Sequence, residues 1–271
     1  MKFMKIIGAT LFALSAGCSK LNIAYDFGSY KLKNSILDSY AFKKSESDQK
    51  IRALWNKNLT ENKKLIFKNL NLLIIDIQKE TLNTELTSDS IESLYTKIKI
   101  QQKILIGLFS TTIESTINEV GTSEVENFKI YSLEKINEYK YTPNDIESRF
   151  LERTESVMDY LFDTITKEQL QISKKFFEDN KLYLLGQKER RINFINMFTS
   201  LFPDKEKMKS YMISYYSADD SIRSPEYKKE IVGLEANSKN FILNMWASLT
   251  AKQKKEFQKT LAVFKEQLDT N

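Results

Sequence analysis

The stretch that decides the fold is LTENKKLIFKNLNLLIIDIQKE, residues 59–80. Its apolar side chains recur at steps of three and four residues, at Ile66, Leu70, Leu73 and Ile77. Lysines take polar positions around them, at 63, 64, 68 and 79. Because this spacing places the apolar side chains along one side of a helix, it predicts an amphipathic α-helix that buries one face.

The same period returns in three other stretches of the chain. In residues 144–162 the apolar set is Ile146, Phe150, Val157 and Leu161, with Leu151, Met158 and Phe162 beside it, and the last stretch aligns Phe257, Leu261, Phe264 and Leu268. Residues 88–120 also read as helix, although Thr111, Thr112 and Thr116 lower the helix propensity there. Strand pairs and short hairpin turn signals do not stand out. We therefore expect an all-α fold, a multi-helix bundle.

The first eighteen residues have the pattern of a bacterial lipoprotein signal peptide. Lys2 and Lys5 precede an apolar run at 6–14, and small residues then lead to Cys18, the only cysteine. Ser15 stands where the usual lipobox has leucine. The run is shorter than the roughly 20 apolar residues that cross a bilayer. We expect cleavage before Cys18 and acylation of that cysteine, with cleavage by an ordinary signal peptidase as the alternative.

Glycine and proline are scarce, which favours long helices with short connections. We expect a signal peptide at 1–17, a lipidated, membrane-proximal tether at 18–44, and helical regions at 45–140 and 141–271. The best candidates for the boundary between an N-terminal and a C-terminal bundle lie at 121–123 and 141–143, and residues 217–225 are the most loop-like stretch of the second half. Whether the two helical regions pack together or form free domains stays open.

The tether is rich in aromatic residues and lysine between residues 21 and 42. These side chains could rest on a lipid surface. The alternative, which we favour, is a connection that leads into a first helix packed on the body of the protein.

Composition excludes several kinds of chemistry. The chain has 271 residues, no histidine and one cysteine, so Ser-His-Asp catalysis, Cys-His catalysis and histidine-ligated metals are ruled out. Its formal charge of +5 falls to +3 once Lys2 and Lys5 leave with the signal peptide. That near balance does not favour nucleic-acid binding. We expect no cofactor, no metal and no enzymatic activity.

Two helix starts share one pattern, an apolar residue followed by Thr-x-x-Gln. They are Ile165 with Thr166 to Gln169, and Leu249 with Thr250 to Gln253. In such a capping box the threonine hydroxyl accepts from the glutamine N–H and the glutamine side chain accepts from the threonine N–H. Looser versions occur at 45–49 and 59–63. These patterns predict helix starts more strongly than they predict a function.

The order of elements resembles an uncharacterised family of all-helical proteobacterial envelope lipoproteins that carry a domain of unknown function. The resemblance lies in Cys18-Ser19 with the aromatic stretch after it, the early helix start at Gln49, Thr166-Lys167-Glu168-Gln169, Arg223-Ser224-Pro225-Glu226-Tyr227 and Ser248-Leu249-Thr250-Ala251-Lys252-Gln253. It covers most of the chain after Cys18 and implies a place in the cell envelope without a known activity. By similarity to Gram-negative lipoprotein sorting, Ser19 favours the outer membrane.

The two Thr-x-x-Gln starts are also similar to the Leu-Thr-x-x-Gln motif of small periplasmic chaperones that respond to envelope stress. That likeness implies a chaperone or stress-adaptor role. Good helix caps shared by chance are the plainer explanation.

Other clusters favour structure over function. Asp219 and Asp220 with Arg223 read as a turn and helix cap rather than an acid–base pair. We expect solvated ion pairs at Glu152, Arg153 and Glu155 and at Glu189, Arg190 and Arg191, and core packing for Tyr211, Tyr215, Tyr216, Trp55 and Trp246.

The function expected from these patterns is a non-enzymatic interaction or structural role at the periplasmic face of the outer membrane. Membrane lipid through acylated Cys18 and an envelope protein would be its partners. A chaperone or stress adaptor is one alternative. A small-ligand carrier or an enzyme with a carboxylate and tyrosine pocket is another.

Overall fold

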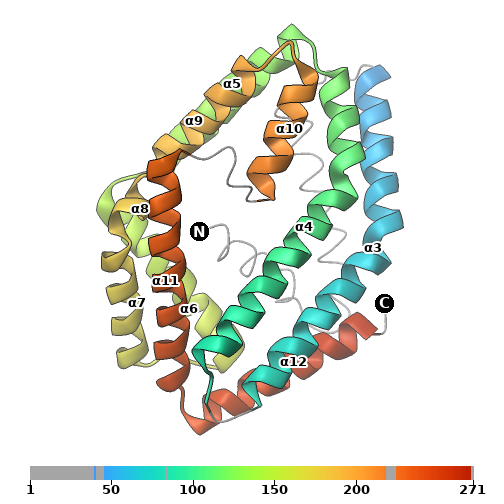
Figure 1. The fold of residues 1–271 in the computed structure, drawn as a ribbon. Coiled ribbons are helices and arrows are strands. Elements are labelled where there is room, and N and C mark those ends of the chain that lie inside the picture. Colours follow the sequence, from blue (N-terminus) through green and yellow to red (C-terminus); the bar gives the residue numbers. More distant parts are fainter. Residues whose placement is uncertain (1–39, 41–45, 83–84, 218–223, 270–271) are drawn as a thin grey trace.

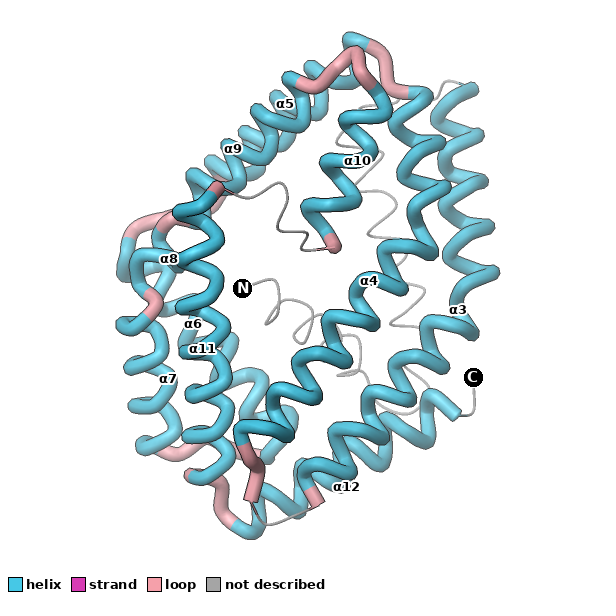
Figure 2. The backbone as a smooth tube through the Cα atoms, viewed as in Figure 1, coloured by secondary structure: helices cyan, strands magenta, loops and turns pink. Residues whose placement is uncertain are grey.

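The computed structural model describes Tyr40 and residues 46–82, 85–217 and 224–269. Within those ranges the chain forms ten helices and no strand, so the predicted all-α class is confirmed. The helices are α3 (Glu46–Thr81), α4 (Ser88–Glu119), α5 (Thr122–Asn137), α6 (Pro143–Phe162), α7 (Lys167–Asp179), α8 (Lys181–Leu185), α9 (Gln187–Ser200), α10 (Lys205–Tyr216), α11 (Pro225–Ala247) and α12 (Ala251–Asp269). Short connections link most of them (Figure 2).

The helices are arranged as a closed ring (Figure 1). The antiparallel pair α3 and α4 forms one side, and α6, α7, α8 and α11 form the opposite side. Helices α5, α9 and α10 connect the two sides at one end, where Lys209 of α10 lies 3.0 Å from Glu114 of α4. Helix α12 closes the other end by packing on α3 and α6.

Local signals explain where several helices begin. Thr142 caps α6, whose first residue is Pro143, and Ser224 caps α11, whose first residue is Pro225. Proline suits that position because its missing N–H would have no helical partner there. At the start of α5 the Gly121 N–H donates to Glu124 Oε2 at 3.0 Å. The chain therefore leaves the helical conformation at 120–121 and at 138–142, while a boundary between two bundles at either place stays a prediction.

One predicted helix start is wrong. The looser Thr-x-x-Lys pattern after Leu59 lies inside α3, which runs without a break through Thr60. Trp55 and Ile51 lie one and two turns earlier, respectively, on the same buried side as Leu59. The apolar spacing therefore continues across residue 60, and no glycine or proline interrupts it.

Three groups of buried apolar residues hold the ring. The lower cluster joins α3, α6, α11 and α12 and contains Ile66, Phe67, Ile74, Met158, Leu161, Phe162, Met245, Trp246, Leu249, Phe257, Leu261, Phe264 and Leu268. The upper cluster joins α3, α4, α5, α9 and α10 and contains Tyr40, Ile51, Trp55, Leu59, Ile113, Ile117, Val120, Val125, Phe198 and Met208. The lateral cluster joins α6, α7, α8 and α11 and contains Ile146, Phe150, Phe176, Phe177, Tyr183, Leu184 and Leu234. All three combine residues from several helices, and the first two include residues from both sides of position 140.

The predicted apolar stripes agree with these clusters in most positions. All four residues of the last stripe, Phe257 to Leu268, are buried. Within the predicted stretch 59–80 of α3 the deepest positions are Phe67 and Ile74 rather than Leu70 and Leu73, which are half-buried. This shift arises because α3 packs against α4 on one flank and α12 on the other, so its buried face is wider than one stripe.

Candidate functional site

Cys18, the predicted lipidation site, lies outside the described residues, and so do Asp219, Asp220 and Arg223. Tyr40 is described and is 3% exposed, with its ring stacked on Phe128 at a centroid distance of 4.9 Å. At this one residue, burial agrees with the interpretation that the tether leads into a segment packed on the body of the protein. Acylation of Cys18 stays a prediction.

The first Thr-x-x-Gln pattern forms a complete capping box at the start of α7. Thr166 has extended backbone angles, and its hydroxyl accepts from the Gln169 N–H at 3.2 Å. In return the Thr166 N–H donates to Gln169 Oε1 at 2.9 Å. Two of the helix's free N–H groups are satisfied in this way.

The second pattern repeats the geometry at the start of α12. The Gln253 N–H donates to Thr250 Oγ1 at 3.2 Å, and the Thr250 N–H donates to Gln253 Oε1 at 2.9 Å. Both distances are the same as in the first box.

The two boxes meet in the interior, although 84 residues separate their glutamines. Gln169 Nε2 donates to Gln253 Oε1 at 3.1 Å, and Gln253 Nε2 donates to Gln169 Oε1 at 3.0 Å. Gln169 is 0% exposed and Gln253 is 2% exposed. We call these four residues, Thr166, Gln169, Thr250 and Gln253, the glutamine junction.

Each glutamine also contacts the chain that leads into the other box. Gln169 Nε2 donates to the Ser248 carbonyl at 3.2 Å, and Gln253 Nε2 donates to the Thr164 carbonyl at 3.0 Å. Ser248 and Thr164 stand two residues before their respective threonine caps, so the junction has an approximate two-fold axis. Both donors and both lone pairs of each amide are thereby used, which is the full capacity of the group.

The packing around the junction follows the same two-fold pattern. Helix α6 leads into α7 and packs on α12, while α11 leads into α12 and packs on α7. Ile165 packs against the lower cluster, and Leu249 belongs to it with an exposed fraction of 7%. Apolar residues from other helices surround Leu249.

An ion pair at the rim breaks the two-fold symmetry. Lys252 Nζ lies 2.7 Å from Asp163 Oδ2, and that hydrogen bond holds the pKa of Asp163 below its usual range. Asp163 ends α6 with a φ of 73°, the left-handed region that aspartate and asparagine tolerate better than other non-glycine residues. The equivalent position before α12 is Ala247, which carries no charge.

The chemistry of the junction is structural. It contains two amides and two hydroxyls, none of which gains or loses a proton near neutral pH. Their hydrogen bonds are made within the protein, and buried amides without partners would be costly. The motif at Thr166 and Thr250 therefore joins the connection between α6 and α7 to the connection between α11 and α12.

The charged residues at the start of α9 differ from the prediction. Arg190 lies over the Tyr183 ring at 4.0 Å, donates to the Tyr183 carbonyl, and is 3.4 Å from Glu230 of α11. Arg191 donates to the Tyr141 hydroxyl at 2.9 Å. Solvated intrahelical ion pairs do not account for these arginines, which bind residues of other elements. The signal in the sequence was the set of tyrosines at 139, 141, 183 and 227, because guanidinium groups stack well on tyrosine rings.

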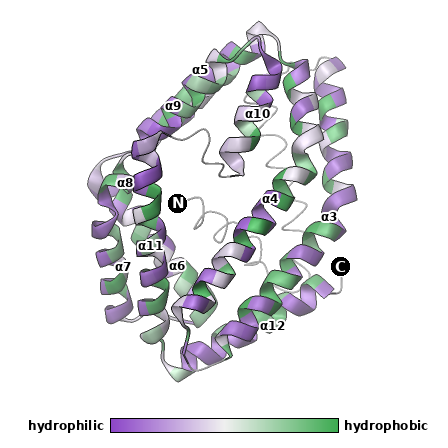
Figure 3. Cartoon of the chain, viewed as in Figure 1, coloured by the Kyte–Doolittle hydropathy of each residue, from purple (hydrophilic) through white to green (hydrophobic). Residues whose placement is uncertain are grey.

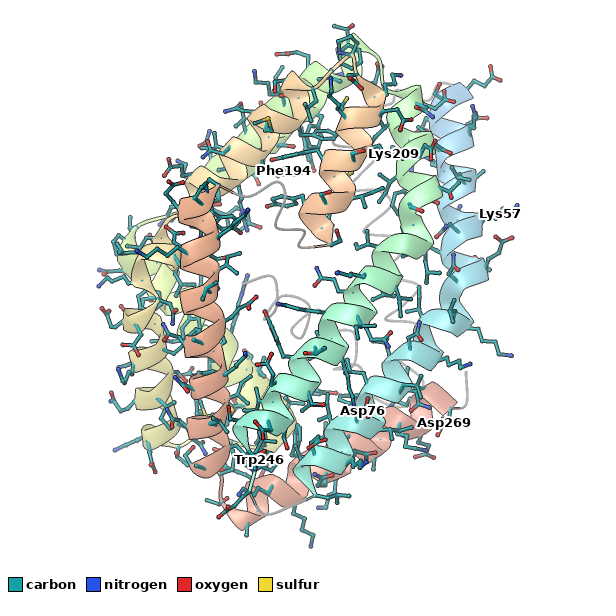
Figure 4. The ribbon with its side chains drawn as sticks, in the orientation of Figure 1. Lys57, Asp76, Phe194, Lys209, Trp246 and Asp269 are labelled. Carbon is teal, nitrogen blue, oxygen red and sulfur yellow. The ribbon has the colours of Figure 1, made fainter. Side chains whose placement is uncertain are left out.

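The tyrosines of α10 are only partly in the core, which corrects the prediction. Tyr211 and Tyr215 are half-buried and pack on Phe194, whereas Tyr216 is 45% exposed. Figure 4 places Phe194 between α9 and α10. Burial raises the pKa of Tyr215 to about 12. The cluster is an aromatic wedge between α9 and α10.

Both tryptophans are buried, as predicted, at 5% exposure for Trp55 and 7% for Trp246. Trp55 Nε1 donates to Thr116 Oγ1 at 3.0 Å, and Thr116 Oγ1 donates to the Thr112 carbonyl at 2.8 Å. The threonines that lower the helix propensity of α4 thus supply a buried hydrogen-bond chain. This role was missed in the sequence analysis. The only signal in the sequence was that Thr112 and Thr116 are four residues apart, which places them on the same side of a helix.

Among the described residues, no three or more Asp, Glu, Cys or His side chains gather closely enough to hold a metal ion. In the same part of the chain no helix has both the length and the apolar character needed to span a bilayer. A shallow groove between α3 and α4 is lined by Lys50, Leu54, Lys57 and Glu119, together with Ile51, Ala53 and Ser115.

Comparison of this all-α chain with family models, with curated proteins and with solved structures finds no match. The resemblances described from the sequence therefore stay predictions. What can be said about function rests on the residues and geometry above.

Proposed function

We propose that this protein is a lipid-anchored envelope protein with a non-enzymatic interaction or structural role at the periplasmic face of the outer membrane. The observation that carries the proposal is the N-terminal pattern, in which two lysines and a short apolar run lead to the only cysteine of the chain. Two or more acyl chains on Cys18 would anchor the protein stably, whereas one chain would bind only marginally.

The non-enzymatic part of the proposal is supported by the glutamine junction. The most specific motif of the chain is used for internal hydrogen bonds between helices, and so it needs no substrate to explain it. The chaperone alternative started from this same motif.

The test is intact-mass and membrane-fractionation analysis of the native protein beside Cys18→Ala and Ser19→Asp variants. We expect acyl mass and an outer-membrane location for the native chain and loss of acyl mass in Cys18→Ala. Ser19→Asp should keep the acyl mass but move to the inner membrane. A native protein without acyl mass would contradict the anchor.

The interaction role is tested separately by crosslinking in whole cells, followed by purification of the native protein. A specific envelope protein recovered with the native chain would support the role. Turnover in a broad hydrolase screen, with no specific partner recovered, would overturn it.

A further inference from the structure

The outward side of α3 has an unusual composition in its second half. From residue 64 to residue 82 every exposed side chain is lysine, leucine or isoleucine: Lys64, Leu65, Lys68, Leu72, Ile75, Lys79 and Leu82. Leu72 is 48% exposed and Leu82 is 71% exposed. Large apolar side chains in one row on a surface call for an explanation, unlike scattered ones.

Helix α4 extends the same surface. Lys97 Nζ lies 2.7 Å from Asp76 Oδ1, which fixes the register of the two antiparallel helices. Leu72 stands one turn before Asp76, and Ile100 stands one turn after Lys97, so in this antiparallel pair both lie on the same side of the ion pair. Ile100 is 51% exposed, and Ile104 in the next turn is 38% exposed. We call residues 64–82 and 100–104, in their exposed positions, the outer face.

The charges of the outer face are all positive. The two acidic residues of α3 in this range are Asp76, which pairs with Lys97, and Glu80, which is half-buried. Lys103 adds a further exposed cation between Ile100 and Ile104. Asp269 at the end of α12 is the acid that approaches α3 from the other flank, and it pairs with Lys265. Apolar side chains near the seam of the two helices are thus bordered by lysines.

The α3 part of the outer face points away from the centre of the ring. Lys57 lies on the same row of α3 as Lys64, two turns earlier, and Figure 4 shows it at the outer edge of the molecule. Figure 3 shows apolar and polar residues interspersed along α3 and α4. From Lys64 to Leu82 the row is about 27 Å long, at about 1.5 Å per residue.

We propose that the outer face of α3 and α4 rests on a membrane surface that carries anionic headgroups. A basic helical face with leucine and isoleucine is typical of contact with such surfaces, where the apolar side chains enter the headgroup boundary and lysines reach the anionic lipids. The centres of protein interfaces are instead enriched in tyrosine, tryptophan and arginine and depleted in lysine. None of those three enriched types is exposed on this face.

This inference deepens the proposed function and rests on it for the source of the membrane, but it makes no use of acylation. The lipid on Cys18 would hold the protein near a bilayer, and the outer face would set how the ring is oriented on it. The experiment therefore uses the full chain with Cys18→Ala, which has no acyl group.

The probe is an environment-sensitive fluorophore on a new cysteine in that background, placed by Leu72→Cys on the outer face. The matched control is Leu182→Cys, because Leu182 on α8 is 86% exposed and far from α3 along the ring. Vesicles are made of phosphatidylcholine alone or mixed with phosphatidylglycerol. We expect a blue shift at position 72 with the anionic vesicles only, weakened by added salt, and no shift at position 182.

Charge reversal supplies the second readout. The triple variant Lys64→Glu, Lys68→Glu and Lys79→Glu should weaken the vesicle affinity seen by the label at position 72 by about tenfold or more. The control triple Lys228→Glu, Lys229→Glu and Lys255→Glu changes the charge equally at exposed positions on α11 and α12 and should leave the affinity within about twofold. Circular dichroism confirms that both triples are folded.

Three results would overturn the proposal: equal shifts at positions 72 and 182, equal shifts with neutral and anionic vesicles, or equal affinities for the two triples. A purified protein partner that protects position 72, with no vesicle effect, would also overturn it in favour of a protein interface. Failure of the anchor appears in another measurement, the acyl mass of the native chain, so the two proposals can fail separately.

Discussion

At the glutamine junction two polar side chains lie in the interior, whereas on the outer face of α3 and α4 leucine and isoleucine side chains lie in solvent. Gln169 is 0% exposed while Leu72 is 48% exposed, the reverse of the usual preference of each residue type. The glutamines can be buried because every polar atom has a partner. The comparison teaches that burial depends on what a side chain pairs with, and that exposed leucines without a packing partner mark a surface available for contact.

The largest expected effect of a mutation lies at the junction. Gln169→Leu would leave the Thr166 N–H, the Ser248 carbonyl and part of the Gln253 amide without partners, so we expect the free energy of unfolding to fall by about 3 kcal/mol. Urea unfolding with an unchanged m-value measures the loss.

A double-mutant cycle sharpens this test. Gln169→Leu combined with Gln253→Leu should cost at least about 1 kcal/mol less than the sum of the single variants, because each single change already orphans the other amide. Additive losses would show that the two amides do not act as a pair.

The next largest effect should lie in the upper cluster. Thr116→Val keeps the side-chain shape but removes the acceptor for Trp55 Nε1, and we expect a loss of about 1–3 kcal/mol. Differential scanning calorimetry would detect it as a lower melting temperature. Ser110→Ala is the control, since the Ser110 hydroxyl contacts only the Gly107 carbonyl at an exposed site. A loss no larger than that of the control would contradict the buried hydrogen-bond chain.

Capping changes should come third, and they separate true helix starts from the false one. Thr166→Ala and Thr250→Ala each remove a side-chain cap and should each cost about 1 kcal/mol. Thr60→Ala, in the middle of α3, should change the stability by less than about 0.5 kcal/mol. Unequal losses at positions 166 and 250 would break the two-fold description of the junction.

The smallest effect concerns pH and compares an ion pair between α3 and α4 with the ion pair at the rim of the junction. Hydrogen bonds from Lys50 and Ser47 lower the pKa of Glu119 between α3 and α4, as the Lys252 hydrogen bond lowers that of Asp163 at the junction. A carboxyl whose pKa is lower in the folded state binds fewer protons there than in the unfolded chain. Its contribution to stability is therefore complete above the unfolded pKa and is lost as the pH falls through the folded pKa.

Glu119→Gln should flatten the acid dependence of the melting temperature between about pH 5 and pH 2 more than Asp163→Asn does. Glu119 is the less exposed carboxyl, with 23% side-chain exposure against 56% for Asp163, so water screens it less. Asparagine tolerates the positive φ of residue 163, which keeps the backbone unchanged. An equal response of the two variants would contradict this ranking.

The sequence was sufficient for the all-α class and for the two capping boxes, because both depend on residues within a few positions of each other. Phe257, Leu261, Phe264 and Leu268 are all buried, as their spacing predicts. The prediction of a helix start at Thr60 was wrong because a capping box forms only where a helix begins. The apolar spacing from Ile51 to Leu59 continues past Thr60, so α3 is not interrupted there.

What sequence reasoning could not reach depends on contacts between distant residues. Nothing local shows that Gln169 and Gln253 share hydrogen bonds, or that Arg190 leaves its own helix for Tyr183 and Glu230. The spacing of leucines and lysines on α3 also does not show whether this row of side chains faces solvent or another helix. Helix α12 covers one flank of α3, and the residues of α12 that do so come almost two hundred positions later in the chain.

The closure of the ring by α12 has a consequence for how the chain acquires its structure. Phe67 and Ile74 of α3 share a cluster with Leu261 and Phe264, and Gln258 Nε2 donates to Thr81 Oγ1 at 2.9 Å. While ribosomes are still making residues 82–250, the side of α3 that carries Phe67 and Ile74 cannot yet pack on α12. Contacts between such distant segments slow folding and leave apolar surface uncovered in the meantime. Until the final helix arrives, the nascent protein depends on whatever shields α3 from aggregation.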